Sequence, residues 1–336
     1  MRKHPETRSE GVIAILAEME KTRVRLVEKS MAEGRRSPSF VFLEGLMDTV
    51  VGDLLVETHL AGKDIIQAML LFSTAISYLS NERPFEWKKE TVVGFTTENY
   101  DELKKLMAEN NLSKNMGQRA LPILLMLAEA NATGPFNAIE LGASTGLIGR
   151  ALVDAQRFVD QIDRYCDISE AFAEYAEGVF DENGIPEIDS YIGIDQKIPD
   201  LNWNYHCIEN EAQRAQFEEF INYFPDSSTN QQLIERSALG FSTMGEVDGR
   251  PLPLVITSMM LYQLPPEIRS QLSAEIASFL SITHGYWVQM DYDEKENRFT
   301  GFFTQFTEPP VQSETVIFSK GESVEYELKD KDHLGS

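Results

Sequence analysis

Apolar residues recur at helical spacing through most of the first 110 residues. They fall three or four positions apart, which is the spacing of one face of an amphipathic helix. Pro84 and the polar residues after it interrupt the pattern, and Asn99 is a candidate cap for the next helix. The pattern predicts an all-helical N-terminal domain over residues 1–112. The expected helices are residues 11–31, 38–61, 64–80 and 98–111.

From residue 115 onward, short apolar runs alternate with amphipathic segments. Such alternation is typical of parallel strands joined by helical crossovers. The segment 231–239 is ambiguous, while 298–304 and 313–327 indicate a closing antiparallel pair. The pattern predicts an α/β domain over residues 113–330, with a doubly wound and mostly parallel sheet. The expected strands are 136–141, 190–195, 253–261 and 284–292, and the expected helices are 147–162, 170–184, 211–224 and 265–280.

Residues 139–149, IELGASTGLIG, combine a strand end, a turn of small residues and a helix start. Glycine has no Cβ, so Gly142 and Gly146 permit a tight turn and let backbone N–H groups approach a ligand. The helix that follows would direct its partially positive N-terminus at that ligand. The G-x-x-x-G spacing fits the dinucleotide fingerprint G-x-G-x-x-G poorly. An ordinary strand-to-helix turn explains the segment equally well.

The same segment resembles motif I of class I S-adenosylmethionine-dependent methyltransferases, in which an acid and one apolar residue precede G-x-(G/S)-x-G. The resemblance implies a Rossmann-like methyltransferase fold, whose first strand, loop and helix hold the methionine and ribose parts of S-adenosylmethionine. The cofactor-binding residues that it implies here are Glu140, Gly142, Ala143, Ser144 and Gly146.

Asp195 ends the second expected strand, in the sequence GIDQ. An acid at this position is able to accept hydrogen bonds from both ribose hydroxyls of a nucleoside. A turn aspartate before Lys197 and Pro199 is the plainer interpretation. The chain between Glu140 and Asp195 is longer than the usual unit, so an extra helix is expected between them.

Thr257 and Ser258 lie at the end of the strand 253–261, before the run Leu261–Leu264. This region resembles the passage from strand four to strand five in class I methyltransferases, where the loop lies against the transferable methyl group and the substrate. Ligands of open α/β sheets bind beyond the carboxyl ends of the strands. The residues expected to share that edge are Glu140, Asp195, Thr257, Ser258, Tyr262 and Asp291.

Further candidates lie outside these strand ends. The candidate substrate-binding residues are Asn115, Arg119 and Tyr262. Asn115 and Arg119 precede the helix before the first strand, where the spacing favours capping and solvated residues over substrate binding. If that helix packs over the cofactor edge, Arg119 would face a carboxylate. Tyr262, His206 and Tyr165 are the candidate bases for an acceptor that must lose a proton. His206 is adjacent to Cys207, but neighbouring side chains usually point apart, which argues against a nucleophilic pair.

Across residues 35–295 the chain also resembles an uncharacterised bacterial family whose members carry the motif E-V-G-A-S-A-G-L-N. IELGASTGL, SKNMGQRALPILLML and YIGIDQKIPDLN carry the resemblance. Ile148 stands where the family has Asn, and Asp163-Arg164-Tyr165 is displaced from the family position of D-R-Y. The family brings no assigned reaction with it.

The formal net charge of −24 makes nucleic acid a poor partner, because a negative surface repels phosphate backbones. The two cysteines and five scattered histidines indicate neither a disulfide framework nor a metal site. No signal-peptide pattern and no apolar run long enough for a bilayer occurs, so a cytoplasmic protein is expected.

Two hypotheses about function follow. The first is an S-adenosylmethionine-dependent methyltransferase that acts on a small molecule. The second is a non-catalytic module with the same fold, whose helical domain binds a partner or a second copy of the chain through the apolar helices of residues 38–80. The orientation of Asp195 and the filling of the pocket at residues 142–146 distinguish the two.

Overall fold

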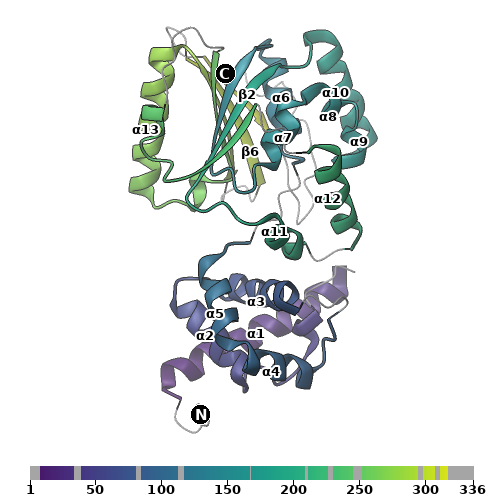
Figure 1. Ribbon diagram of the computed structural model, residues 1–336, viewed down its shortest axis with the longest axis vertical. Coiled ribbons are helices and arrows are strands. Elements are labelled where there is room, and N and C mark those ends of the chain that lie inside the picture. The colour runs from purple at the N-terminus through teal and green to yellow at the C-terminus, as the bar shows by residue number, and fades with distance from the viewer. Residues whose placement is uncertain are drawn as a thin grey trace. The chain divides into compact units, whose positions relative to one another are not determined.

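The computed structural model describes residues 8–33, 39–80, 85–112, 117–166, 168–208, 211–225, 230–244, 252–293, 298–306 and 311–316. The chain forms two compact units, drawn in Figure 1. Unit 1 comprises Met1–Lys114 and Pro199–Ala215, and unit 2 comprises Asn115–Ile198 and Gln216–Ser336. The segment 199–215 thus groups with the N-terminal helices, although the sequence pattern assigned it to the α/β domain.

Unit 1 is built from helices over the residues that the structure describes. Asn99 lies between α4 and α5, and its side-chain amide donates to the carbonyl of Phe95 at 2.9 Å. The sequence pattern suggested that Asn99 caps the start of α5. Its side chain instead binds the end of α4. The helical elements are α1 (Glu10–Glu33), η2 (Ser39–Phe42), α2 (Val50–Leu60), α3 (Ile65–Ser80), α4 (Lys89–Glu98), α5 (Tyr100–Glu109) and α11 (Leu201–Cys207).

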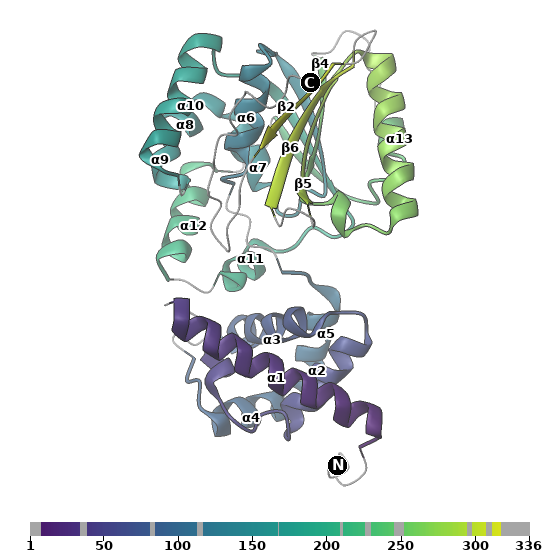
Figure 2. The ribbon, with the colours of Figure 1, turned by 180° about the vertical axis from the view of Figure 1, so that it is seen from behind.

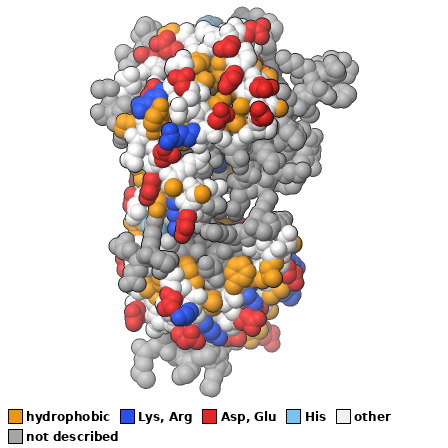
Figure 3. Space-filling model, turned by 90° about the vertical axis from the view of Figure 1, so that its right-hand side faces the viewer, with side chains coloured by type: hydrophobic (Ala, Val, Ile, Leu, Met, Phe, Trp, Pro, Cys, Tyr) orange, Lys and Arg blue, Asp and Glu red, His pale blue; other side chains and the backbone are white. Residues whose placement is uncertain are grey.

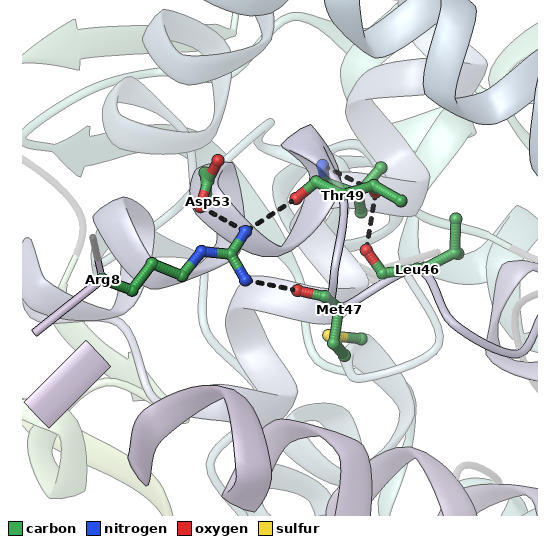
Figure 4. A network of polar contacts seen from close by, with 6 residues as sticks. Arg8, Leu46, Met47, Thr49 and Asp53 are labelled. Carbon is green, nitrogen blue, oxygen red and sulfur yellow. Dashed lines mark hydrogen bonds and ion pairs between the residues drawn. The ribbon is translucent and has the colours of Figure 1, made fainter. Parts of the chain in front are cut away.

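Arg8 ties the chain before α1 to the start of α2 (Figure 4). Its guanidinium forms an ion pair with Asp53 at 2.7 Å and donates to the carbonyls of Met47 and Thr49 at 3.4 Å each. The Thr49 hydroxyl accepts from the N–H of Val51 at 3.2 Å, which caps α2. The turn before α2 is therefore held from two sides.

The segment 199–215 is held in unit 1 by α3 and by the end of the N-terminal region. The indole of Trp203, 2% exposed, donates to the carbonyl of Asn111 at 2.9 Å. The ring of Tyr78 meets that of Trp203 edge to face at 5.5 Å between centroids. His206 Nδ1 lies 2.8 Å from the hydroxyl of Ser77. These contacts make α11 part of the helical core.

Unit 2 contains a seven-stranded sheet in the order β3-β2-β1-β4-β5-β6-β7 over the described residues. The first five strands in that order run parallel, while β6 is antiparallel to both of its neighbours. The fold is a mixed α/β fold with a mostly parallel sheet. The strands are β1 (Phe136–Leu141), β2 (Ile188–Asp195), β3 (Gln231–Glu235), β4 (Leu252–Ser258), β5 (Tyr286–Asp293), β6 (Arg298–Gln305) and β7 (Val311–Val316).

The structure changes two details of the predicted pattern and agrees with a third. The ambiguous segment 231–239 begins with a strand, β3, that pairs with β2. The single helix expected over 147–162 is wrong, since the backbone leaves the helical region at Asp154 (φ −122°, ψ 47°). The closing pair is present as β6 and β7, and residues 317–327 of its expected second strand lie outside the described residues.

Helices cover both faces of the sheet, as Figures 1 and 2 show. On one face α13 packs Leu272, Ile276 and Leu280 against Leu141 and Val255 of the sheet. The other face carries α6 and α7, with α10 packed against α6. The helices of unit 2 are α6 (Ala120–Glu129), α7 (Leu147–Val153), α8 (Ala155–Val159), α9 (Ile162–Tyr165), α10 (Glu170–Asn183), most of α12 (Glu211–Tyr223) and α13 (Pro266–Thr283), with 3-10 turns η3 (Phe241–Met244) and η4 (Leu261–Gln263).

The net charge of −24 is not gathered into one patch on the face drawn in Figure 3. Acidic and basic side chains occur there on both units. On this face the charged side chains therefore do not mark a docking surface.

Replacing the buried indole of α11 tests whether residues 199–215 belong to unit 1. We expect Trp203→Ala to destabilise unit 1 by about 3–5 kcal/mol, because a large side chain leaves a packed core. Hydrogen exchange should accelerate in α3 and α11 and stay unchanged in β1. Leu60→Ala, at a side chain 66% exposed, is the control. Faster exchange in β1 alone would contradict the grouping.

Candidate functional site

The strand order places a switch point between β1 and β4. From β1 the chain passes through α7–α10 to β2 on one side, and from β4 it passes through α13 to β5 on the other. In open α/β sheets, ligands bind beyond the carboxyl ends of the strands at such a switch point. The candidate site is therefore the loop after β1, the end of β2 and the end of β4.

The loop after β1 requires glycine at two positions. Gly142 (φ +80°) and Gly146 (φ +70°) adopt left-handed backbone conformations. A Cβ on Gly142 would lie 2.6 Å from the Cγ atom of Met260, and a Cβ on Gly146 would lie 2.6 Å from a methyl group of Leu233. Backbone conformation and space both exclude a side chain at either position. Ser144 (φ +51°) is also left-handed between them.

The backbone N–H groups of this loop are used within the protein. Those of Gly142 and Ala143 donate to the carbonyl of Ile194 at 2.8 and 3.1 Å, and that of Gly146 donates to Ala143 at 2.9 Å. The expectation that these groups face a ligand is therefore wrong. The reason is that the loop closes over the end of β2, whose acceptors lie nearest. The helix after the loop, α7, is only seven residues long, so its N-terminus does not support the predicted ligand contact.

Asp195 points at the loop. Its Oδ2 atom accepts from the N–H of Ser144 at 2.8 Å, and its Oδ1 atom accepts from the N–H of Lys197 at 3.3 Å. The carboxylate thus joins the end of β2 to the middle of the loop. The two functional hypotheses differ in whether Asp195 points toward the loop or away from it. It points toward the loop, as the methyltransferase hypothesis requires.

Glu140 is the most perturbed acid of the site. Its side chain is 1% exposed and accepts a hydrogen bond from the hydroxyl of Tyr191. Burial raises the pKa of Glu140 to about 8; the Tyr191 hydrogen bond and the charge of Arg119 act in the opposite direction, and Asp195 raises it further. Arg119 therefore lies near a carboxyl group, as the sequence pattern suggested. Burial also raises the pKa of Tyr191 well above its usual value.

The sequence reasoning missed Tyr191. Its ring lies against Gly149 of α7, where a Cβ would come 2.3 Å from the Cε1 atom of the ring. Its hydroxyl would lie 3.0 Å from a Cβ on Gly193. The sequence offered only a weak signal for this residue. Gly149 on α7 and Gly193, two residues after Tyr191 on β2, leave room for its aromatic ring.

The two polar residues that end β4 have different environments. Thr257, fully buried, accepts a hydrogen bond from the indole of Trp287 at 3.0 Å. Ser258 is 4% exposed, and its Oγ atom has no hydrogen-bond partner among the described residues. Glu140 pairs with Ile256 in the sheet, so side-chain alternation places Ser258 on the same face as Glu140. A buried hydroxyl without a partner thus lies at the switch point.

Tyr262 lies in η4 directly after β4. Its backbone N–H donates to Asp291 Oδ1 at 3.0 Å, and its carbonyl accepts from Arg269 at 3.0 Å. Its hydroxyl lies 3.3 Å from the side-chain amide of Gln263. Asp291 thus holds the turn after β4 in place, so these two residues do meet at the edge where the sequence placed them.

Tyr165 and His206, the other candidate bases, are packed among residues of their own surroundings. Tyr165 packs against Phe220 and Phe224 at 5.3 and 5.7 Å between ring centroids, and burial raises its pKa. His206 is 4% exposed within unit 1, beside Ser77. Asn115 lies outside the described residues.

The described residues contain no group of three or more His, Cys, Asp or Glu side chains arranged to hold a metal ion. Within the same ranges, every helix is too short or too polar to cross a bilayer.

No protein-family model matches the chain, and no curated protein matches it. The chain is similar to a solved structure from Plasmodium falciparum, assigned as a protein-L-isoaspartate O-methyltransferase and bound to S-adenosyl-L-homocysteine. The identity is 10%, the match covers 62% of this chain and 72% of that chain, and the TM-score is 0.27. A likeness of this size carries no argument, so the resemblance to the uncharacterised bacterial family stays a prediction.

A methyl group at the first loop glycine tests the geometry of the loop. We expect Gly142→Ala to lower the free energy of unfolding by at least about 1–2 kcal/mol, because alanine is strained in the left-handed region and its Cβ would also lie 2.6 Å from Met260 Cγ. Gly178→Ala is the matched control, since a Cβ at this helical position meets nothing within 4 Å. It should raise stability by about 0.5–1 kcal/mol in urea unfolding. Equal effects would contradict the assigned loop conformation.

The buried carboxyl predicts a pH dependence. Folding raises the pKa of Glu140 from 4.5 to about 8, so the folded state holds a proton that the unfolded state has lost. Stability from this group is complete below pH 4.5 and falls as the pH rises through 8. Relative to Glu140→Gln, the wild type should lose on the order of 4 kcal/mol across that range. Urea unfolding of both proteins at each pH measures it, and a constant difference would refute it.

Proposed function

We propose that the chain is an S-adenosylmethionine-dependent methyltransferase that acts on a small molecule. The proposed cofactor site lies at the carboxyl ends of β1, β2 and β4. Its residues are Glu140, Gly142, Ala143, Ser144, Gly146, Asp195, Thr257 and Ser258.

The observation that carries the proposal is the unpaired hydroxyl of Ser258. A buried polar group without a partner costs about 1–3 kcal/mol, so proteins rarely keep one without a use. This hydroxyl lies at the switch point, on the face of the sheet that carries Glu140. A polar atom of a ligand at the switch point would satisfy it.

Two further features support a nucleoside cofactor at this edge. The Asp195 carboxylate has only backbone N–H partners among its hydrogen bonds described above, so ribose hydroxyls are able to replace the one from Ser144. Gly142 and Gly146 keep the loop surface free of side chains of its own. The side chains of Met260 and Leu233 lie against these two glycines, so a ligand that approaches this backbone has to displace them.

The reaction asks little of the protein beyond alignment. S-adenosylmethionine supplies an electrophilic methyl group on a sulfonium ion, and transfer runs largely by proximity and orientation. Among the candidate bases, we assign any proton removal to Tyr262, because it follows β4 and is held at the edge by Asp291. Arg119 is the proposed substrate-binding residue nearest to Glu140, and its charge lowers the Glu140 pKa. The local packing of Tyr165 and His206 supports structural roles for both.

One observation favours the second candidate, a non-catalytic binding module. The side chain of Met260 lies directly over Gly142, at 2.6 Å from the position that a Cβ would occupy. If this side chain stays in place, it occupies part of the surface on which the cofactor would lie. The near atoms are Met260 Cγ and Cβ, at 2.6 and 2.9 Å from that position, so movement of the flexible thioether end clears only part of this surface.

Calorimetric titration with S-adenosylhomocysteine tests the proposal. The wild type should bind, and Ser258→Ala should bind about tenfold more weakly, since one hydrogen bond is lost. The same substitution should leave stability unchanged or higher, because it removes an unpaired buried hydroxyl. Thr300→Val is the control, since Thr300 carries another buried hydroxyl without a partner, on a different strand. It should not alter binding.

Two more variants distinguish the candidates. Gly142→Val should abolish binding, and Met260→Ala should leave it unchanged or strengthen it. Binding by Met260→Ala alone would favour the non-catalytic module, because the native side chain would then block the cofactor. Undetectable binding to every variant and to the wild type at millimolar ligand would reject both the cofactor and the reaction.

A further inference from the structure

Two buried ionisable side chains, Glu140 on β1 and Tyr191 on β2, lie beside each other, with the half-buried Arg119 near them. Glu140 accepts the hydroxyl of Tyr191, and Arg119 lies close enough to lower the Glu140 pKa. Both Glu140 and Tyr191 are 1% exposed. Nothing in an ordinary strand-to-helix turn requires a carboxyl group to be buried here, where apolar residues would avoid the desolvation penalty.

We propose that Tyr191 is a positioning residue that orients the buried Glu140 carboxyl and keeps its ionised form attainable, so that a cationic ligand binds with release of one proton from Glu140 to the solvent. A neutral ligand of the same shape binds without that release. The inference rests on the proposed function and assigns a role to a residue that the function alone does not use.

The packing of Tyr191 allows little movement. Its ring fills the space left by Gly149 on α7, and its hydroxyl lies where a Cβ on Gly193 would crowd it. The hydroxyl is therefore aimed at Glu140 by the backbone on two sides. Of the two, Glu140 is the group whose proton is exchangeable, since the Tyr191 pKa is raised well above its usual value.

The surroundings of Glu140 contain few other charges. Asp195 on β2 raises its pKa, while Arg119 lowers it and Tyr191 donates to it. From β4 the same face presents the uncharged Ser258, and on α7 the guanidinium of Arg150 donates instead to the carbonyl of Phe224 at 3.3 Å. A sulfonium at the switch point would thus add a second cation beside Arg119 to a site that holds the carboxyl groups of Glu140 and Asp195.

The sign of the linkage follows from these positions. In the free protein the Glu140 pKa is about 8, so the carboxyl is mostly protonated at pH 7. A bound cation stabilises the carboxylate and lowers that pKa, which means that binding releases a proton and strengthens as the pH rises toward 8. Above pH 8 the carboxyl is already ionised, and the affinity levels off.

The test is calorimetry of S-adenosylmethionine and S-adenosylhomocysteine in two buffers of different ionisation enthalpy. At pH 7 the sulfonium ligand should release about half a proton or more per site from Glu140, and the neutral sulfide close to none. The ratio of the two affinities should rise about tenfold between pH 6.5 and 8.5. Glu140→Gln should abolish the extra proton release and make the ratio of affinities independent of pH. Any proton release that remains in this variant comes from the ligands' own ionisation.

Tyr191→Phe keeps the ring in its packed position and removes only the hydroxyl. It should move the pH dependence of the ratio upward by about one unit, because the carboxylate loses a donor. Tyr175→Phe is the matched control, since Tyr175 donates to Glu129 and not to Glu140. It should change neither proton release nor the ratio.

The outcomes separate the two proposals. Binding of both ligands with equal proton release in wild type and Glu140→Gln would overturn this inference and leave the proposed function standing. An unchanged pH profile in Tyr191→Phe would overturn the role of Tyr191. Failure of the wild type to bind either ligand would reject the proposed function, and this inference with it.

Discussion

The closure of the loop 142–146 onto the end of β2 is the interaction on which the candidate site depends. The Ile194 carbonyl accepts two of the loop's N–H groups, and the Asp195 carboxylate accepts a third. This closure forces the left-handed backbone at Gly142 and starts α7 at the next turn. It also uses the amides of Gly142, Ala143 and Ser144 within the protein, so the proposed cofactor site depends on the side chains of Glu140, Asp195 and Ser258.

The sheet was readable from the sequence because burial leaves a direct mark on composition. The runs around Ile139, Ile192 and Val255 carry apolar residues on the face that packs against α13, and helices lie on both faces of the sheet. β3 was ambiguous because its residues are only partly buried, so its alternation is weak. The break at Asp154 was missed because the apolar spacing of 147–162 continues through it, although the backbone does not.

The site was less predictable than the fold. Glycine spacing and the acids at strand ends led to Gly142, Glu140 and Asp195, since such residues are chosen for local geometry. Tyr191 was invisible because its role depends on a partner in another strand, 51 residues away. For His206 the sequence shows a titratable group in a polar stretch, and only the fold reveals that it is buried in unit 1 beside Ser77.

The return of residues 199–215 to the helical unit constrains the order in which the chain becomes structured during synthesis. The helices before residue 114 lack Trp203 and its hydrogen bond to Asn111 until α11 has been made. By then β1 and β2 have already left the ribosome. Unit 1 is therefore the first unit whose synthesis begins, but it is not able to complete its folding before parts of unit 2 have been made. A fragment cut at residue 112 would expose the apolar surface that α11 covers.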